Sequence, residues 1–217
     1  MNALKACGQW SRPRPICFEK FVAACVTRGD ASMLAELPAS AAGREVIIQK
    51  PHRNGYDHAV RTAGVTLLEV GQAGRVSPEQ IEAAIHADTV AILFVFGETI
   101  DRRGEVSLKD IVDIGKRRGV PIILDASVAN YPFDRLQEFA ALGIDLITTS
   151  GGKHIFGPPG TGFLFGRQDL MDVCRLMANP IHGIGRPLKI GKEEIVGLVT
   201  ALEIYVERDV EAEHRGW

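Results

Sequence analysis

From about residue 46 onward, the chain alternates short runs of β-branched and apolar residues with segments that have a helical pattern. The runs expected to be strands are 45–49, 65–70, 89–96, 120–125, 144–150 and 161–166. Several are apolar on both faces, which is typical of strands covered by helices on either side. The alternation predicts an α/β fold, a three-layer, mostly parallel sheet with helices on both faces. In such sheets, ligands bind at the carboxyl ends of the strands.

The segments between the strands carry signals for helix starts and ends. Residues 77–80, Ser-Pro-Glu-Gln, predict an N-cap with a capping box. Ser107 opens a second helix, which the glycine Gly119 is expected to end. A last helix, at roughly 193–211, carries an apolar stripe at the spacing of an amphipathic helix. The residues of this stripe are Ile195, Leu198, Val199, Leu202, Tyr205 and Val206.

Composition narrows the class of protein. A length of 217 residues suits one domain, or one domain and a small appendage. The net charge of −2 lacks the excess of basic residues that is typical of proteins that bind nucleic acid or an anionic membrane. No apolar run approaches the roughly 18–20 residues that span a bilayer, and the first residues lack the apolar stretch of a secretory signal. We therefore expect a cytoplasmic protein without a membrane or nucleic-acid partner.

The chain has four cysteines, and they show neither CxxC spacing nor a nearby histidine cluster. They are Cys7, Cys17, Cys25 and Cys174. This pattern predicts reduced structural thiols and no metal site.

The stretch SGGKHIFGPPGTGFLFGR, residues 150–167, carries the chemistry. Its GPPGTG segment resembles the start of a P-loop, but Phe163 and Leu164 stand where a P-loop needs Lys and Ser or Thr. The glycines also precede a strand, whereas a P-loop precedes a helix. A second interpretation starts from Lys153. This lysine places an amine shortly after the strand 144–150, among glycines that let a ligand approach the backbone. A lysine in this position suits imine formation.

Asp125 occupies the matching position one strand earlier, at the end of 120–125. It lies 28 positions before Lys153, about one strand–helix–strand unit. A lysine and a carboxylate on neighbouring strand ends meet the demands of pyridoxal phosphate, because the lysine holds the aldehyde carbon as a Schiff base and the acid keeps the pyridine nitrogen protonated. On these residues alone, a surface lysine and an N-capping aspartate remain the alternative.

Longer stretches carry a specific resemblance. DAS at 125–127, followed by 145–167, resembles the cofactor-lysine region of fold-type I pyridoxal phosphate enzymes. The likeness continues through 46–71 and 179–205. It is greatest to the group around bacterial selenocysteine synthase (L-seryl-tRNA selenium transferase) and D-glucosaminate-6-phosphate ammonia-lyase. The resemblance implies the large domain of that fold, pyridoxal 5'-phosphate as cofactor, and a homodimer or higher homo-oligomer.

The resemblance also implies roles for single residues. Lys153 matches the lysine that forms the Schiff base, and Asp125 matches the partner of the pyridine nitrogen. His52, just past the strand 45–49, falls where this fold places the group that stacks on the cofactor ring, with a turn-capping loop histidine as the alternative. Ser150 is placed to hydrogen-bond the cofactor phosphate, and Thr161, or the backbone beside it, is a further candidate.

Arg186, in the stretch GIGRPLK, is a candidate for binding a substrate carboxylate or phosphate, since a guanidinium binds either group through two hydrogen bonds. A solvated surface arginine is the alternative. The substrate implied by the resemblance is a small amino acid or amino sugar acid, which reacts by Cα deprotonation and β-elimination.

Departures from the family pattern keep alternatives in view. Gly152 stands where selenocysteine synthases have an aspartate and cysteine desulfurases usually have a histidine. The tRNA-binding N-terminal region of the synthases has no counterpart here, which favours a small-molecule lyase over a selenium transferase or a desulfurase-like enzyme.

The chain is also shorter than its family. The expected division is an irregular segment at 1–20, a cofactor-binding large domain at 21–192, and a helix at 193–217 that leads to an absent small domain. The Gly/Ala-rich loop that holds the cofactor phosphate in relatives has no counterpart in the first residues. A non-catalytic remnant of such an enzyme is therefore a further hypothesis.

Overall fold

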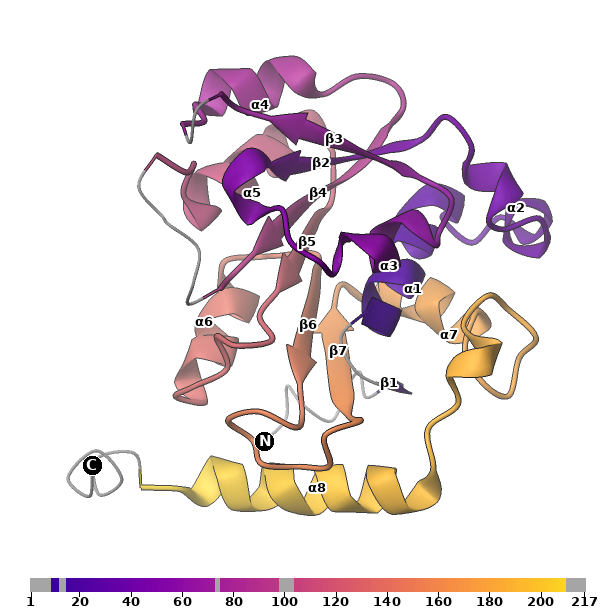
Figure 1. Cartoon of the computed structure of the whole chain (residues 1–217), viewed down its shortest axis with the longest axis vertical. Coiled ribbons are helices and arrows are strands. Elements are labelled where there is room, and N and C mark those ends of the chain that lie inside the picture. Colours follow the sequence, from indigo (N-terminus) through magenta and orange to yellow (C-terminus); the bar gives the residue numbers. More distant parts are fainter. Residues whose placement is uncertain (1–8, 12–14, 73–74, 98–103, 210–217) are drawn as a thin grey trace.

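The structure, a computed structural model, describes residues 9–11, 15–72, 75–97 and 104–209, with side chains from residue 19 onward. They contain one seven-stranded sheet of order β1-β7-β6-β5-β4-β2-β3 (Figure 1). The strands are β1 Gln9–Ser11, β2 Glu45–Gln49, β3 Thr66–Val70, β4 Thr89–Val95, β5 Ile122–Asp125, β6 Leu146–Ser150 and β7 Gly162–Gly166. From β3 to β6 neighbouring strands are parallel, while β7 runs antiparallel to both β6 and β1. The predicted mostly parallel α/β sheet is confirmed.

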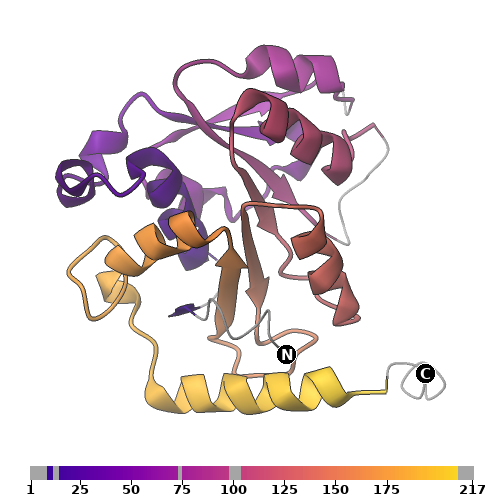
Figure 2. The same cartoon turned by 180° about the vertical axis from the view of Figure 1, so that it is seen from behind.

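Helices cover both faces of this sheet, as Figures 1 and 2 show from opposite sides. The helices are α1 Pro15–Thr27, α2 Ala31–Ala35, α3 Asp57–Arg61, α4 Pro78–Ala84, α5 Leu108–Arg118, α6 Asp134–Ala141, α7 Gln168–Leu176 and α8 Lys192–Glu207, with short 3-10 turns η2 Ala39–Ala41, η3 Lys50–His52 and η4 Arg186–Leu188. Residues of α1, α3 and α7 pack in one core cluster, and residues of α4, α5 and α6 pack in another. The two clusters establish the predicted three layers.

The central strands separate the two cores by simple alternation. In β2, Val46 and Ile48 belong to the cluster with α1, whereas Ile47 belongs to the cluster with α5. In β4, Leu93 and Phe94 divide in the same way. Because both faces of a central strand are buried, its sequence is a continuous apolar run, the pattern from which it was predicted.

The predicted helix signals act as expected. The Ser77 side chain accepts a hydrogen bond from Gln80 N–H, and the Gln80 side chain accepts one from Ser77 N–H, which completes the capping box of α4. Ser107 caps α5 through Asp110 N–H. Gly119 ends α5 with a left-handed φ of 68°, a conformation that costs glycine little.

Two boundaries differ from expectation. Within the segment 1–20, which was expected to be irregular, Gln9–Ser11 form β1 and α1 begins at Pro15. Residues 1–8 and 12–14 lie outside the described part. β1 is short and takes its structure from pairing with the edge of β7, so its own sequence shows no strand pattern. The last helix ends at Glu207 instead of about 211, because Arg208 has an extended backbone; residues 210–217 are not described.

Helix α8 lies across the carboxyl-terminal end of β6, beneath the turn between β6 and β7 (Figure 1). Leu198 and Tyr205 are its buried residues, and both face this turn region. In the part of the chain that the structure describes, no helix is long and apolar enough to cross a membrane.

Candidate functional site

Asp125 is the last residue of β5 and lies between β4 and β6, opposite Val95 and Thr148. The residue is buried, and its Oδ1 accepts a hydrogen bond of 2.9 Å from Ser127 N–H. Its backbone carbonyl accepts a second, of 2.8 Å, from Phe96 N–H. The carboxylate is therefore held in a defined position at the carboxyl edge of the sheet.

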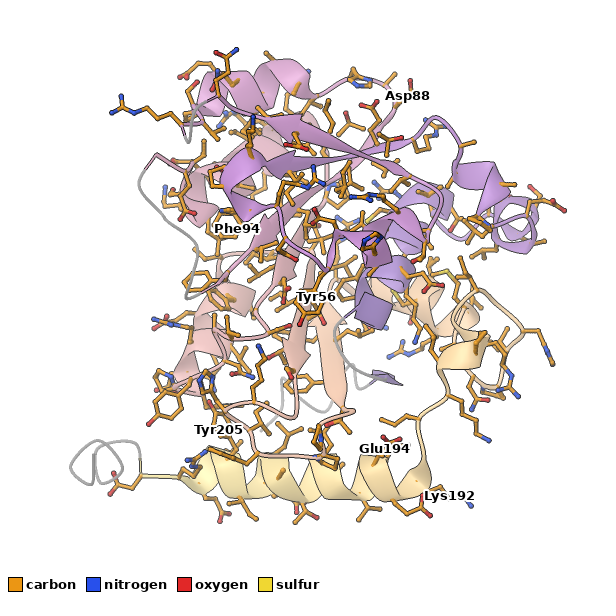
Figure 3. All side chains as sticks on the ribbon, viewed as in Figure 1. Tyr56, Asp88, Phe94, Lys192, Glu194 and Tyr205 are labelled. Carbon is orange, nitrogen blue, oxygen red and sulfur yellow. The ribbon has the colours of Figure 1, made fainter. Side chains whose placement is uncertain are left out.

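A shallow pocket opens beside this carboxylate. Its lining residues are Asn54, Tyr56, Asp57, Val60, Leu93, Val95 and Asp125. Tyr56, which is 43% exposed, lies near the centre of the molecule in Figure 3.

The loop after β2 presents Tyr56 in a fixed conformation. The Asn54 side chain accepts a hydrogen bond of 2.8 Å from Tyr56 N–H and donates one of 3.1 Å to the His52 carbonyl. Arg53 forms ion pairs with Asp57 and with Glu69, and hydrogen bonding to Asp57 raises the pKa of the Arg53 guanidinium. In this segment sequence reasoning singled out only His52, although the Asn54-Gly55 pair that follows the 3-10 turn after β2 is a turn signal near the carboxyl edge.

Lys153 lies in the turn 151–161, at the carboxyl end of β6 and therefore on the strand next to Asp125. The turn is closed by backbone hydrogen bonds from Gly151 N–H to the Thr161 carbonyl and from Phe156 N–H to the Lys153 carbonyl. Lysine and acid thus occupy adjacent strand ends, as their sequence positions indicate. Lys153 does not itself line the pocket beside Asp125.

The glycines of this turn allow close packing within the protein itself. A Cβ atom on Gly151 would lie 2.4 Å from Thr161 Oγ1 and 2.5 Å from Leu198 Cδ1. A Cβ atom on Gly152 would lie 2.6 Å from Pro159 Cα. The space that these glycines leave open is filled by the turn itself and by α8. They are needed for close packing of the protein, and their expected role in the approach of a ligand stays a prediction.

Asn130 is a second residue that sequence reasoning missed. Its buried side chain donates hydrogen bonds to Thr149 Oγ1 (2.9 Å) and to the Ser150 carbonyl (3.0 Å). Its Oδ1 contacts His154 Nδ1 at 3.0 Å, and Tyr205 of α8 donates its hydroxyl proton to the Asn130 carbonyl. Asn130 therefore joins the end of β6, the lysine turn and α8.

Ser150 and Thr161 differ in their capacity to bind a ligand. Ser150 is buried, and its hydroxyl makes no hydrogen bond to any residue that the structure describes. The Thr161 hydroxyl, also buried, donates to the Pro158 carbonyl at 2.6 Å and so holds the turn. Ser150 thus retains its hydrogen-bonding capacity, whereas the Thr161 proton is already used. Their predicted contacts with a cofactor phosphate stay predictions.

His52 and Arg186 complete the set of predicted site residues. The His52 side chain is wholly buried, with its ring edge-on to Phe94 at a centroid distance of 4.5 Å. Arg186 begins η4, which Figures 1 and 2 both place beside α7 and away from the lysine turn. A single chain therefore gathers Asp125, Ser150 and Lys153 at one edge but does not bring Arg186 to them.

The described cysteines are buried. Cys25 in α1 and Cys174 in α7 lie within the core and form no disulfide among the described residues, and burial raises the pKa of the Cys25 thiol to about 12. A thiol in this state is a poor nucleophile at neutral pH. Among the residues with described side chains, no group of three His, Cys, Asp or Glu residues could hold a metal ion.

A solved structure of D-glucosaminate-6-phosphate ammonia-lyase superposes with a TM-score of 0.84 and 31% identity, covering 94% of this chain and 54% of that chain. The Escherichia coli cysteine desulfurase CsdA shares the fold, with a TM-score of 0.60 at 18% identity. The fold is that of the large domain of fold-type I pyridoxal phosphate enzymes. The family model SelA, described as L-seryl-tRNA selenium transferase, matches residues 22–215. The chain belongs to this family.

Curated relatives carry several different activities. D-glucosaminate-6-phosphate ammonia lyase of Salmonella typhimurium is 34% identical over 189 residues, 85% of this chain and 49% of that protein. The 5'-C-glycyluridine monooxygenase-decarboxylase of a Streptomyces species is 34% identical over 192 residues, 85% and 46% of the two chains. An L-seryl-tRNA(Sec) selenium transferase of Geotalea daltonii is 28% identical over 198 residues, 83% and 42%. The chain spans about half the length of these relatives.

Proposed function

We propose that this chain binds pyridoxal 5'-phosphate at Lys153 and acts as a cytoplasmic lyase on a small amino acid or amino sugar acid. The observation that carries the proposal is the placement of Asp125 and Lys153 at adjacent carboxyl ends of β5 and β6, beside a pocket lined by Asp125. Relatives of the chain belong to families that depend on this cofactor, and the ammonia-lyase is prominent among them.

The residues present fit the cofactor. Asp125 offers a buried, oriented carboxylate for the pyridine nitrogen, and Lys153 offers an amine one strand away. The buried Ser150 hydroxyl, which makes no hydrogen bond to a described residue, offers a donor for the phosphate. When bound, pyridoxal phosphate supplies an electrophilic aldehyde carbon and an electron-accepting ring.

The proposed reaction assigns one task to each residue. Once the substrate amine has displaced it from the cofactor, Lys153 Nζ would take the proton from Cα of the substrate, and the Asp125 carboxylate would keep the ring nitrogen protonated. The bond to a β-hydroxyl then breaks, and the hydroxyl leaves as water with a proton returned from Lys153. The eliminated product hydrolyses to a 2-keto acid and ammonia.

Arg186 is the proposed ligand of a substrate carboxylate or phosphate. Because η4 lies away from the lysine turn within one chain, the proposal includes a homodimer in which Arg186 serves the site of the second copy. A selenium-transferase reaction is less favoured, because the position before Lys153 is Gly152 and the chain has no basic footprint for tRNA.

The first test is to load the purified chain with pyridoxal phosphate, record its visible spectrum, reduce it with borohydride and map the modified peptide. We expect a visible band and a label on Lys153. Lys153→Ala should lose both, whereas Lys192→Ala, at the exposed start of α8, should retain both. Asp125→Asn should weaken cofactor binding, because the ring nitrogen loses its anionic partner.

A second candidate function rests on the lining of the pocket. Lys153 does not line the pocket beside Asp125, which favours a non-catalytic domain that retains the chemical residues. Label scattered over exposed lysines, without a visible band, would support this candidate and exclude the lyase.

A further inference from the structure

The His52 ring has a defined pattern of hydrogen bonds. Its Nδ1 lies 3.2 Å from the backbone nitrogen of Val95, which donates its proton to the ring. Because the amide can only donate, Nδ1 must be unprotonated, and the ring proton must be on Nε2. Nε2 lies 2.8 Å from Glu105 Oε2, a carboxylate oxygen that accepts a hydrogen bond from Nε2–H. The network therefore assigns the neutral Nε2–H tautomer.

Gln49 makes a similar contact with Val106, the residue after Glu105. Its side-chain amide donates to the Val106 carbonyl at 3.1 Å, and its Oε1 accepts from Val106 N–H at 2.7 Å. Gln49 is wholly buried, like His52. Gln49 at the end of β2 and His52 in η3 thus hold both the last residue of β4 and the segment that leads into α5.

Val95 connects this network to the candidate site. It is the last residue of β4, lies opposite Asp125 in the parallel register, and lines the same pocket. The next residue, Phe96, donates its N–H to the Asp125 carbonyl. His52 itself does not line the pocket. A displacement of Val95 would therefore move the pocket wall and the backbone that carries the carboxylate.

We propose that His52 is a positioning residue, which holds the carboxyl end of β4 against Asp125 through both ring nitrogens and does not act by stacking on the cofactor. The geometric part concerns the cofactor-free chain. The link to cofactor binding rests on the proposed function.

The two roles for His52 predict opposite responses to substitution. A stacking role needs a flat aromatic face, which His52→Phe would keep. A positioning role needs an acceptor toward Val95 and a donor toward Glu105, both of which Phe lacks. Asn and Gln each keep part of this capacity, since an amide oxygen can replace Nδ1 and an amide nitrogen can replace Nε2.

The first experiment needs no cofactor. Nitrogen-15 NMR of the imidazole should show a protonated Nε2 and an unprotonated Nδ1 at neutral pH. Hydrogen exchange of the Val95 amide should be slow in the wild type and at least about tenfold faster in His52→Phe, because a buried donor loses its acceptor. A proton on Nδ1, or unchanged exchange at Val95, would refute the proposal.

The second experiment measures the apparent Kd for pyridoxal phosphate from the visible band. We expect His52→Phe to raise the Kd at least about tenfold, and the better of His52→Asn and His52→Gln to stay within about threefold of the wild type. Glu105→Gln, which keeps an acceptor for Nε2–H, should also bind normally. His86→Phe is the matched control, since His86 is an exposed histidine paired with Glu45 at the other end of β2.

The outcomes separate this proposal from the proposed function. Normal binding by His52→Phe, with weak binding by both amide variants, would establish stacking and refute positioning. If the wild type itself takes no label on Lys153, the proposed function fails, while the tautomer and the Val95 exchange rate still decide the role of His52. If His52→Phe does not fold, the tautomer in the wild type and the Kd values of His52→Asn and His52→Gln decide it.

Discussion

Leu198→Ala should release α8 from the lysine turn. Leu198 is wholly buried, and its Cδ1 would lie only 2.5 Å from a Cβ atom on Gly151 and 3.2 Å from one on Gly157. The substitution removes three carbon atoms, at about 0.8 kcal/mol each for burial, or about 2.4 kcal/mol. The cavity left behind adds to this cost, and Leu→Ala changes in protein cores cost about 2.7–5 kcal/mol. We expect a loss of about 2.5–4 kcal/mol in the free energy of unfolding.

Urea unfolding followed by circular dichroism measures this loss, and native-state hydrogen exchange over residues 192–207 locates it. The control is Val196→Ala on the same helix, at a position 64% exposed, which should change the free energy of unfolding by no more than about 0.5 kcal/mol. Equal losses for the two variants, or unchanged exchange in α8 of Leu198→Ala, would show that this contact does not hold the helix to the turn.

Three further substitutions test the packing. Lys20 is buried, and its ammonium group makes no hydrogen bond or ion pair with a described residue. Lys20→Met should therefore leave the free energy of unfolding in urea unchanged or raise it. A loss above about 1 kcal/mol would contradict this reasoning. Burial raises the Cys25 pKa from 9.0 to about 12, so above pH 9 the unfolded thiol ionises while the folded thiol does not. Stability should then fall by up to about 1.4 kcal/mol per pH unit between about pH 9 and 12, and a Cys25→Ala variant with the same alkaline slope as the wild type would rule this out. Gly151→Ala would place a Cβ atom 2.4 Å from Thr161 Oγ1. It should lower the free energy of unfolding in urea by about 1–3 kcal/mol and reduce labelling of Lys153. Gly55→Ala is the control and should do neither, because no atom lies within 4 Å of its new Cβ.

The strands with two buried faces could be predicted from the sequence to within two residues. The predicted strand 89–96 is Thr89–Val95 in the structure. A continuous apolar run indicates such a strand because its side chains are buried in the core clusters on both faces of the sheet. The run 120–125 begins two residues late, at Ile122; Pro121 has no N–H to donate to the sheet ladder. β1 could not be predicted, since its three residues are a strand only through their pairing with β7.

The positions of two site residues, Asp125 and Lys153, could also be predicted from the sequence. The ends of adjacent parallel strands share one edge of a sheet, so the places of Asp125 and Lys153 followed from strand order. Asn130 could not be found in this way, because its partners Thr149 and His154 are 19 and 24 residues away and meet it only in the folded chain. The enclosure of His52 likewise depends on Glu105, 53 residues further on.

The antiparallel pairing of β6 with β7 has a consequence for the order of folding. These strands are neighbours in sequence, joined by the turn 151–161, and they pair over residues 146–150 and 162–166. Local pairing of this kind loses little chain entropy, whereas the pairs β4–β5 and β5–β6 each need a crossover through a helix. The hairpin that carries Lys153 is thus expected to form before Asp125 acquires its neighbours. A refolding chain would present its reactive amine before the carboxylate that completes the site.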